Sequence, residues 1–426
     1  MTSIETFELS DASHRIALNQ SCFCMTLSRD TLDADIVAGV NIDGFAGLLT
    51  DRSNLFATTG VFVSPIDIAD MKAQVAAIEA ASALKAYQSA VGDRSDDGLL
   101  QKQLNTKGLF MGYDFHISDK GPQLIEVNTN AGGGFLAAAL QDAVGRAAFT
   151  CGDAQLENES VATQKMLETF SAEWRQTGRS GRPETIAIVD EEPESQYLYP
   201  DMILAQYHLE KSGIKALIVD PKELSYLGRK VRYGSLRVDM IYNRLTDFDF
   251  SQPQNSVLRK ALLDDAAVIS PAPRHHAELA DKRNLIWLSD ADLLREWGLN
   301  DVHISALKSV PKTVAVTPAN AEALWAARKE YFFKPTAGFG GRATYRGGKL
   351  TKRVWAEISK GNYIAQAFIP PTMRAVTVDG EPGTLKYDLR LYTYAGETLL
   401  IAARVYQGQT TNFRTNGGGF AVVYKC

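Results

Sequence analysis

The stretch LIEVNTNAGGG, residues 124–134, constrains the fold more than any other part of the chain. Its first half has the composition of a buried strand, but two polar residues, Glu126 and Asn128, interrupt the apolar run. Side chains alternate along a strand, so we expect Glu126 and Asn128 to share one face with Leu124, and Ile125 and Val127 to point the other way. Burying a carboxylate and an amide costs free energy unless both find partners. The strand must therefore face other polar groups or a ligand.

The preceding segment offers such a partner. Residues 109–117, LFMGYDFHI, alternate in the manner of a strand and place Asp114 and His116 on one face. Turn residues at 118–122 lead back into the next strand, which predicts a β-hairpin over residues 109–128. Asp114, Glu126 and Asn128 would then be three neighbouring oxygen donors, a set that suits Mg²⁺ together with substrate phosphates. A hydrogen-bonded strand pair beside a loop is the structural alternative.

Composition describes a globular protein of several structural units. The chain has 426 residues, of which 45% are hydrophobic and 22% charged, and its net charge is −5. This charge argues against a nucleic-acid-binding surface, which needs a basic footprint. The N-terminus lacks the basic and apolar regions of a signal peptide, and no apolar run approaches the ~20 residues of a membrane span. The cysteines, Cys22, Cys24, Cys151 and Cys426, follow neither a disulfide nor a zinc pattern, so we expect free thiols and a cytoplasmic location.

The central part of the chain predicts helices and a parallel sheet. A helix is expected from Ser64 to Val91, with Ser64 as N-cap and Pro65 at the first position, and another from about Phe135 to Ala148. Two apolar strands flank an amphipathic helix in a βαβ unit, and one further strand follows; these segments are 185–190, 198–213, 215–220 and 238–245. The acidic stretches 190–195 and 246–250 are expected to be solvated loops.

A glycine-rich loop between two strands, residues 330–350, is the best phosphate-binding candidate. Lys334 ends an apolar strand, and Gly338, Gly340 and Gly341 would let the backbone turn its N–H groups toward anionic oxygens. The loop has neither the residue order of a P-loop nor the following helix of a dinucleotide-binding motif. A simple glycine-rich turn is the alternative. The segment before it, 275–290, is expected to be helical, and its adjacent His275 and His276 suit a metal poorly.

A second hairpin is predicted at residues 386–406. It places Asp388 and Arg390 on one strand face and Arg404 on the returning strand. These three residues would form either a structural ion-pair ladder or a site in which a carboxylate serves a metal and the guanidiniums clamp phosphoryl oxygens.

Together these segments resemble the ATP-grasp superfamily of carboxylate–amine ligases. The glycine loop, the strand YIAQAFI, the hairpin with Asp388 and the segment NFRTNGGG follow the usual order, but the Glu-x-Asn stretch stands ahead of them instead of last. Joining the end of the chain to a point near residue 108 would restore that order. The chain is therefore similar to circularly permuted members, namely glutathionylspermidine synthetase and the eukaryotic type of glutathione synthetase. Permutation also predicts that the last strand and residues 109–114 belong to one sheet.

The resemblance implies an α/β fold with a circularly permuted ATP-grasp core and a preceding βαβ domain. It divides the chain into an N-terminal helical and mixed segment (1–105), a permuted part of the core with metal ligands (106–150), a βαβ substrate-side domain (183–275) and a nucleotide-binding ATP-grasp domain (276–426).

The resemblance also implies a ligase that forms an amide through an acyl phosphate, with ATP and Mg²⁺ as cofactors. ATP would lie among Lys282, Lys334 and the glycine loop, with Gln366 near the adenine. The metal would be held by Asp114, Glu126 and Asn128, and the catalytic residues would be Asp388, Arg390 and Arg404.

The chain departs from the family pattern at one residue expected to bind the acyl phosphate. The glutathionylspermidine synthetases are expected to carry an arginine two residues before the first metal carboxylate, and this chain has Gly112 there. The clamp would then come from Arg390, Arg404 or Arg414.

The substrates implied are a small-molecule carboxylate and an amine, such as an amino acid, a short peptide or a polyamine. The polyamine rests on the net negative charge and the acidic loops. Two other functions stay open: an inactive ATP-binding regulatory or interaction protein, and a phosphotransferase that stops at a phosphorylated product.

Overall fold

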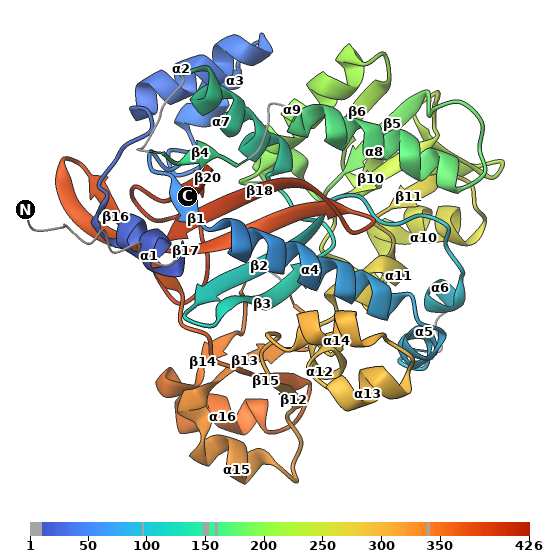
Figure 1. Ribbon diagram of the computed structural model, residues 1–426. Coiled ribbons are helices and arrows are strands. Elements are labelled where there is room, and N and C mark those ends of the chain that lie inside the picture. The colour runs from blue at the N-terminus through green and yellow to red at the C-terminus, as the bar shows by residue number, and fades with distance from the viewer. Residues whose placement is uncertain (1–10, 96–97, 148–152, 158–160, 339–340) are drawn as a thin grey trace, which may run out of the picture.

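The computed structural model describes residues 11–95, 98–147, 153–157, 161–338 and 341–426. Its centre is an antiparallel sheet in which the strands follow the order β19-β18-β17-β2-β3, and a sixth strand, β16, pairs with β17 (Figure 1). The bounds are β2 Met111–Ser118, β3 Gly121–Asn128, β16 Thr372–Val378, β17 Glu381–Tyr394, β18 Glu397–Tyr406 and β19 Gly419–Ala421. Both predicted hairpins, β2–β3 and β17–β18, are therefore confirmed.

Strands that are far apart in the sequence lie side by side in this sheet. Strand β2 pairs with β17, so that Asp114 is opposite Arg390, and β18 pairs with β19 near the end of the chain. The expectation that the last part of the chain shares a sheet with residues 109–114 is confirmed for β19. Strand β20 (Val423–Lys425) instead belongs to a three-stranded sheet of order β1-β20-β4, with β1 at Val61–Val63 and β4 at Gln155–Leu156.

The turn of the second hairpin sets the pairing of the residues next to it. Ala395 and Gly396 both have positive φ, 50° and 83°. This is the conformation of the two-residue turns that match the twist of antiparallel strands. The register shifts by one residue between Tyr392 and Thr393, and beyond this shift Asp388 lies opposite Arg404.

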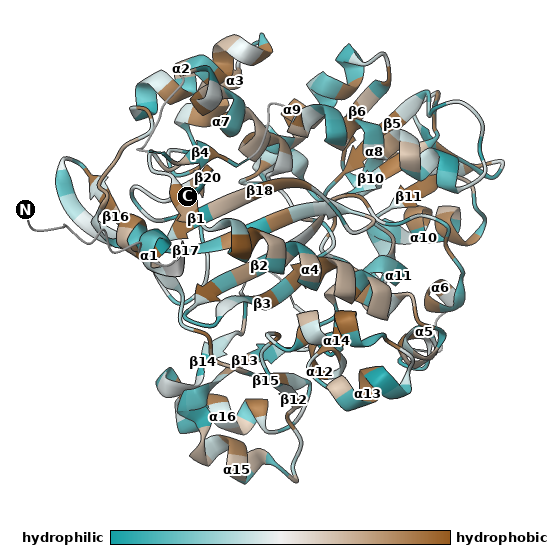
Figure 2. Cartoon of the chain, viewed as in Figure 1, coloured by the Kyte–Doolittle hydropathy of each residue, from teal (hydrophilic) through white to brown (hydrophobic). Residues whose placement is uncertain are grey.

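A long helix covers one face of the central sheet (Figure 1). Helix α4 (Pro65–Ser82) begins where expected, because the Ser64 side chain accepts a hydrogen bond from the Asp67 N–H. The single helix predicted to Val91 is wrong: α5 (Lys85–Gly92) is a separate helix. Tyr87 of α5 is fully buried and packs edge-on against Trp287 and Trp297, so tertiary contacts orient this segment. Apolar segments lie along α4 and the central strands, and α13 (Ala291–Glu296) at the periphery mixes hydrophilic and apolar residues (Figure 2).

The βαβ prediction is confirmed. Strands β5 (Thr185–Val189) and β6 (Lys215–Val219) are parallel and flank α9 (Tyr199–Lys211) in the chain. Strands β10 (Met240–Asn243) and β11 (Val268–Ser270) extend the parallel sheet in the order β11-β10-β5-β6. The helix predicted at residues 135–148 is α7 (Gly134–Arg146).

A small sheet carries the glycine loop. Its order is β12-β15-β13-β14, with β12 at Thr313–Ala315, β13 at Tyr331–Pro335, β14 at Tyr345–Arg346 and β15 at Tyr363–Ala367. Helices α15 (Ala321–Ala326) and α16 (Lys352–Ile358) contribute Leu324 and Ile358 to its hydrophobic core. The helix expected at 275–290 is interrupted, since α11 (Pro273–His275) runs into a π-helix (His276–Ala280) and α12 (Asn284–Leu288) follows after a break.

The remaining elements surround these sheets. They are α1 (Asp11–Ser21), α2 (Arg29–Val40), α3 (Phe45–Thr50), α6 (Gly98–Gln101), α8 (Ala162–Gln176), α10 (Ser256–Leu263), α14 (Asp301–Leu307), β7 (Leu224–Leu227), β8 (Lys230–Tyr233) and β9 (Leu236–Val238).

The cysteine prediction needs a correction. Cys22 and Cys24 form a disulfide, because the turn after α1 brings their Cα atoms within 5.4 Å, inside the range that a disulfide spans. Cys426 is a thiol outside any disulfide, as expected, and its Sγ donates to the Val63 carbonyl; Cys151 lies outside the described residues. No helix in the described ranges is both long enough and apolar enough to cross a membrane.

Candidate functional site

A cavity of about 550 Å³ takes its walls from both the central sheet and the small sheet. Ten of the twelve site residues predicted from the sequence line it: Asp114, Glu126, Asn128, Lys282, Lys334, Gly338, Gly341, Gln366, Arg390 and Arg404. Asp388 lies behind this wall, and Gly340 lies outside the described residues. Segments separated by more than 200 residues in the chain thus meet at one place.

A β-bulge shapes the wall at Glu126. Asp114 pairs with Glu126 and Phe115 with Leu124, so Ile125 is an extra residue in β3. The expected alternation is therefore wrong at this point: Leu124 packs in the hydrophobic core with Val127 and not beside Glu126. The bulge releases the Ile125 carbonyl from the strand ladder, and the Lys334 Nζ donates to it at 2.6 Å.

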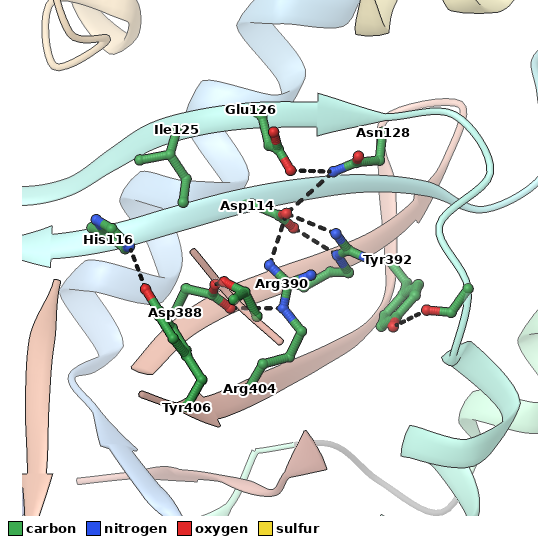
Figure 3. A network of polar contacts seen from close by, with 12 residues as sticks. Asp114, His116, Ile125, Glu126, Asn128, Asp388, Arg390, Tyr392, Arg404 and Tyr406 are labelled. Atoms are coloured by element: carbon green, nitrogen blue, oxygen red, sulfur yellow. Dashed lines mark hydrogen bonds and ion pairs between the residues drawn. The ribbon is translucent and has the colours of Figure 1, made fainter. Parts of the chain in front are cut away.

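Asp114 is the centre of a buried ion-pair network (Figure 3). Its Oδ1 accepts from Arg390 Nε at 2.6 Å, and its Oδ2 accepts from Arg390 at 2.7 Å and from Arg404 at 2.8 Å. The Asn128 amide donates to Asp114 Oδ2 at 3.1 Å and to Glu126 Oε1 at 3.4 Å. Burial acts to raise the pKa of Asp114, but the guanidiniums of Arg390 and Arg404 outweigh it and hold the pKa below its usual value.

Asp388 positions Arg404. Its Oδ1 accepts from Arg404 Nε at 2.7 Å, and its Oδ2 accepts from the Thr411 hydroxyl. Asp388 is fully buried, so a substrate in the cavity meets Arg404 first. On the same side of the cavity, His116 contacts the Ile369 carbonyl at 3.0 Å and the Tyr406 hydroxyl at 3.4 Å. Burial lowers the pKa of His116, so its ring is neutral near pH 7.

Lys334 is a buried ammonium that faces the cavity. Desolvation lowers its pKa to about 8, the Glu126 carboxylate opposes this shift, and Lys282 adds to it. Lys282 lies near the glycine loop and donates to the Gly338 carbonyl at 2.8 Å. Each of these ammonium groups contacts a backbone carbonyl, and a bound anion would replace that contact with a charge pair.

The glycine loop approaches its neighbours closely. Gly341 has φ +67°, and a Cβ on it would lie 2.9 Å from the Thr410 hydroxyl oxygen. The Gln409 amide donates to the Thr344 carbonyl at 3.0 Å, which ties the segment after the loop to residues 407–411 of the central sheet side. Glycine is required at 341 for both the backbone conformation and the space.

One end of the cavity is aromatic. Phe332 and Phe368 have nearly parallel rings, 6.4 Å apart at an interplanar angle of 13°, and the Arg346 guanidinium lies 4.4 Å from the Phe368 centroid. Gln366 is buried between them and β3, where its amide donates to the Leu124 carbonyl at 3.5 Å. Neither phenylalanine was predicted from the sequence, although Phe332 is two residues before Lys334 and Phe368 is two residues after Gln366.

Charge distinguishes this cavity from the rest of the protein. Eight lysines and arginines line it against two carboxylates within the described part of the chain, a formal excess of six positive charges in a protein whose net charge is −5. In those residues, no cluster of three or more His, Cys, Asp or Glu side chains could hold a metal by itself. The cavity is therefore suited to a polyanion.

Solved structures share this arrangement of the chain. A glutathione synthetase-like effector from Globodera pallida, solved in its apo form, superposes with a TM-score of 0.55 and 12% identity over 94% of this chain and 98% of that chain. The chain has a glutathione synthetase-like fold. The resemblance read from the sequence is thus confirmed at the level of the fold.

Two further structures are less similar to it. A candidate gamma-glutamylcysteine synthetase from Methylobacillus flagellatus gives a TM-score of 0.45 and 10% identity, over 83% of this chain and 84% of that chain. The ATP-grasp ligase PsnB, complexed with its minimal precursor, gives 0.31 and 12%, over 56% of this chain and 89% of that chain. No protein-family description and no curated protein sequence matches the chain.

Three expectations change within this glutathione synthetase-like fold. Residues 246–250 are not a solvated loop, since Asp247 and Phe250 are buried and Phe248 lines the cavity. His276, set aside in the sequence analysis, lines it too, in a face-to-face stack with Phe248. Arg414 is exposed and does not line the cavity, so of the three arginines expected at the acyl phosphate only Arg390 and Arg404 line it.

Gly112 makes room for Arg390. A Cβ at this position would lie 2.6 Å from the Ala131 Cβ and 3.2 Å from Arg390 Nε. Arg390 of the adjacent strand therefore takes part of the space that a larger side chain at position 112 would need.

Gly112→Ala should therefore destabilise the protein by about 1–3 kcal/mol through overpacking, and displace Arg390. Gly47→Ala is the matched control, because nothing lies within 4 Å of a Cβ there and the residue is inside α3. Denaturant unfolding of the two variants checks this, and equal stabilities would show that Gly112 is not a packing constraint.

Proposed function

We propose that this chain is an ATP-dependent ligase that joins a carboxylate to an amine through an acyl phosphate. The observation that carries the proposal is the cationic cavity, where Lys282, Lys334, Arg390 and Arg404 converge beside Glu126 in an acidic protein. Positioning and charge neutralisation are what phosphoryl transfer requires of a protein. The glutathione synthetase-like fold is in keeping with this chemistry.

The proposal includes a circularly permuted ATP-grasp core. Strands β2 and β3 would be the part moved to the front of the chain, and the pairing of β2 with β17 supports this interpretation. Residues 106–150 and 276–426 would then form the core, and the βαβ unit at 183–275 would be the domain that precedes it. The N-terminal segment, 1–105, contributes α4 to the cover of the central sheet.

ATP would lie along the small sheet. The adenine fits between Gln366 and the Phe332–Phe368 pair, since aromatic faces and a buried amide suit a planar base. The phosphates would reach Lys334 and Lys282, and the glycine loop would cover them with backbone N–H groups.

Magnesium fits two of the three predicted ligands best. Glu126 and Asn128 present a carboxylate and an amide to the cavity, which are oxygen donors of the kind Mg²⁺ takes alongside phosphates. Asp114 differs, because both of its oxygens already accept guanidinium hydrogens. We therefore assign the metal to Glu126 and Asn128, with Asp114 as the residue that holds the arginines. When bound, the ion would neutralise phosphate charge.

The proposed reaction has two steps. A carboxylate oxygen of the acid attacks the γ-phosphorus of ATP, and the bond to the β,γ-bridging oxygen breaks to release ADP. The amine then attacks the carbonyl carbon of the acyl phosphate, forming the amide and releasing inorganic phosphate and one proton. Arg390 and Arg404 would hold the phosphoryl oxygens through both steps, because their planar guanidiniums are fixed by Asp114 and Asp388.

The acidic loops no longer support a polyamine as the amine. Residues 190–195 do not line the cavity, and only Phe248 of 246–250 does.

A screen of ADP release against mixed acids and amines tests the ligase. We expect ADP formation that requires both an acid and an amine, with an amide of the combined mass as product. A stable phosphorylated acid without amide would favour the phosphotransferase. ATP binding without turnover on any mixture would favour the regulatory protein and contradict our proposal.

Lys334→Ala should weaken ATP binding about 10- to 100-fold, the loss of one charge-assisted hydrogen bond, and change the melting temperature little. Without a ligand, the pKa of Lys334 is about 8, and a bound phosphate would raise this pKa. ATP binding to the parent near pH 8 should therefore be accompanied by proton uptake. Calorimetry in buffers of different ionisation enthalpy measures both effects.

Lys360→Ala, an exposed lysine on the same unit, is the control and should match the parent. Equal ATP affinity and equal proton uptake in Lys334→Ala and the parent would remove Lys334 from the nucleotide site.

A further inference from the structure

Contacts made along β3 show which residues lie at each end of the cavity. The Gln366 amide contacts the Leu124 carbonyl, and Lys334 contacts the Ile125 carbonyl. Glu126 and Asn128 follow beside Asp114, and the Thr129 hydroxyl lies 3.4 Å from His276 Nδ1. At about 3.3 Å per residue, the far end at Thr129 is more than 10 Å from the Gln366 end. It lies beyond the groups that we assign to ATP.

This far end is walled by a rigid, flat pair of rings. Phe248 and His276 stack face to face, with centroids 3.8 Å apart and an interplanar angle of 4°, and both line the cavity. His276 opens the π-helix, a local irregularity that often marks functional sites. Desolvation lowers the pKa of His276 to about 4, so the ring is uncharged near neutral pH.

The loop that carries Phe248 is fixed from within. The Asp247 carboxylate accepts hydrogen bonds from the Gln252 N–H at 3.0 Å and from the Asn255 amide at 2.6 Å. Phe250 has φ +51°, which is costly for a bulky residue and persists only where the surroundings enforce it. Phe248 is therefore presented to the cavity in one conformation.

The polar groups at this end are neutral. The Asn130 amide donates to the Leu245 carbonyl, which leaves its oxygen as an acceptor, and the Thr129 hydroxyl contacts His276. The two carboxylates of the cavity are in its middle. Asp114 pairs with arginines, and Glu126 contacts Asn128 and acts on Lys334. A cationic substrate side chain would therefore meet no carboxylate among Thr129, Asn130, Phe248 and His276, and the lining cation that acts on His276, Lys282, is one that we assign to the ATP phosphates.

We propose that the end formed by Phe248, His276, Thr129 and Asn130 binds an uncharged, planar side chain of the substrate, so that the ligase acts on an aromatic amino acid or a short peptide that carries one. This inference rests on the proposed function. A flat side chain extends the existing stack, and the neutral polar groups orient it. Glutamate-like and polyamine substrates are disfavoured by the same wall.

Binding of four probes tests the inference without turnover. Saturation-transfer NMR would measure the affinities of L-phenylalanine, L-alanine, L-glutamate and spermidine for the full chain, with and without a non-hydrolysable ATP analogue and Mg²⁺. We expect phenylalanine to bind about three- to tenfold more tightly than each of the others. Phe248→Leu keeps an apolar side chain and removes the flat ring, and should abolish the preference, whereas Phe248→Tyr should keep it.

Phe368→Leu at the nucleotide end is the matched control. It should weaken binding of the ATP analogue and leave the preference for phenylalanine unchanged. Tighter binding of glutamate or spermidine, no binding of any probe, or an unchanged preference in Phe248→Leu would each overturn the inference. If Phe248→Leu fails to fold, the ranking of the four probes on the parent decides alone. Nucleotide binding by the parent, measured in the same titrations, tests the proposed function separately.

Discussion

Replacing Asp114 with alanine should lower the free energy of unfolding by about 3–5 kcal/mol, because it leaves buried charge without its partner. Arg390 and Arg404 both direct their guanidiniums at this one carboxylate, and all three side chains are buried. Without Asp114 the two cations would repel each other across the central sheet. Urea unfolding of the purified variant measures the loss.

The matched control is Asp119→Ala, an exposed turn residue of the same hairpin, which should change stability by no more than about 0.5 kcal/mol. The double variant Asp114→Ala, Arg390→Ala should lose less than the sum of the single losses, since it removes the cation that loses its partner, whereas Arg404 keeps its ion pair with Asp388. A loss below about 1 kcal/mol in Asp114→Ala would show that the network does not stabilise the fold.

The contribution of Asp114 to the free energy of unfolding should decrease at low pH. The folded-state pKa of Asp114 is below its ordinary value, so its contribution is complete above that ordinary value and is lost as the pH falls through the folded-state pKa. The difference in stability between the parent and Asp114→Ala should therefore begin to shrink as the pH falls toward the ordinary pKa of an aspartate, about 4, and continue to shrink through the lower folded-state pKa.

Glu126→Gln should lower turnover by about 100-fold or more and leave the fold intact. The substitution keeps the size of the side chain and removes the charge that we assign to the metal and phosphates. Glu126 is only partly buried, and its contact with the Asn128 amide can also be made by a glutamine oxygen. Steady-state turnover at several magnesium concentrations, together with the melting temperature, measures both effects.

A purely structural role for Glu126 predicts the reverse pattern, a clear loss of stability with a normal rate for the folded fraction. Glu381→Gln, at the exposed start of β17, is the control for a charge loss outside the cavity and should match the parent in both measurements. Near-normal turnover in Glu126→Gln would remove this residue from the metal site.

Local patterns predicted most of the elements that carry the site. Alternation and turn residues predicted both hairpins, although a register shift within each hairpin, and not the turn itself, sets Asp114 opposite Glu126 and Asp388 opposite Arg404. The βαβ unit and the strand before the glycine loop were also predicted, because their apolar runs and turn signals are contiguous in the chain.

The remaining features depend on contacts that no local pattern records. The bulge at Ile125 shifts the register by one residue, and the alternation of the surrounding strand gives no sign of it. Asp388 was predicted to act in the cavity, yet the position of β17 between β18 and β2 places it behind Arg404. Phe248 and His276 come from loops far apart in the chain, so their stack follows only from the packed structure.

The most direct test of the central claim follows an isotope from the acid to the phosphate. With an acid and an amine that support ADP release, the acid would be labelled with ¹⁸O in its carboxyl group and the inorganic phosphate analysed by mass spectrometry. An acyl phosphate predicts one labelled oxygen in the phosphate for each amide formed, because the carboxylate oxygen that attacks ATP leaves with the phosphoryl group. Amide formation with no label in the phosphate would contradict the mechanism that we propose for this cavity.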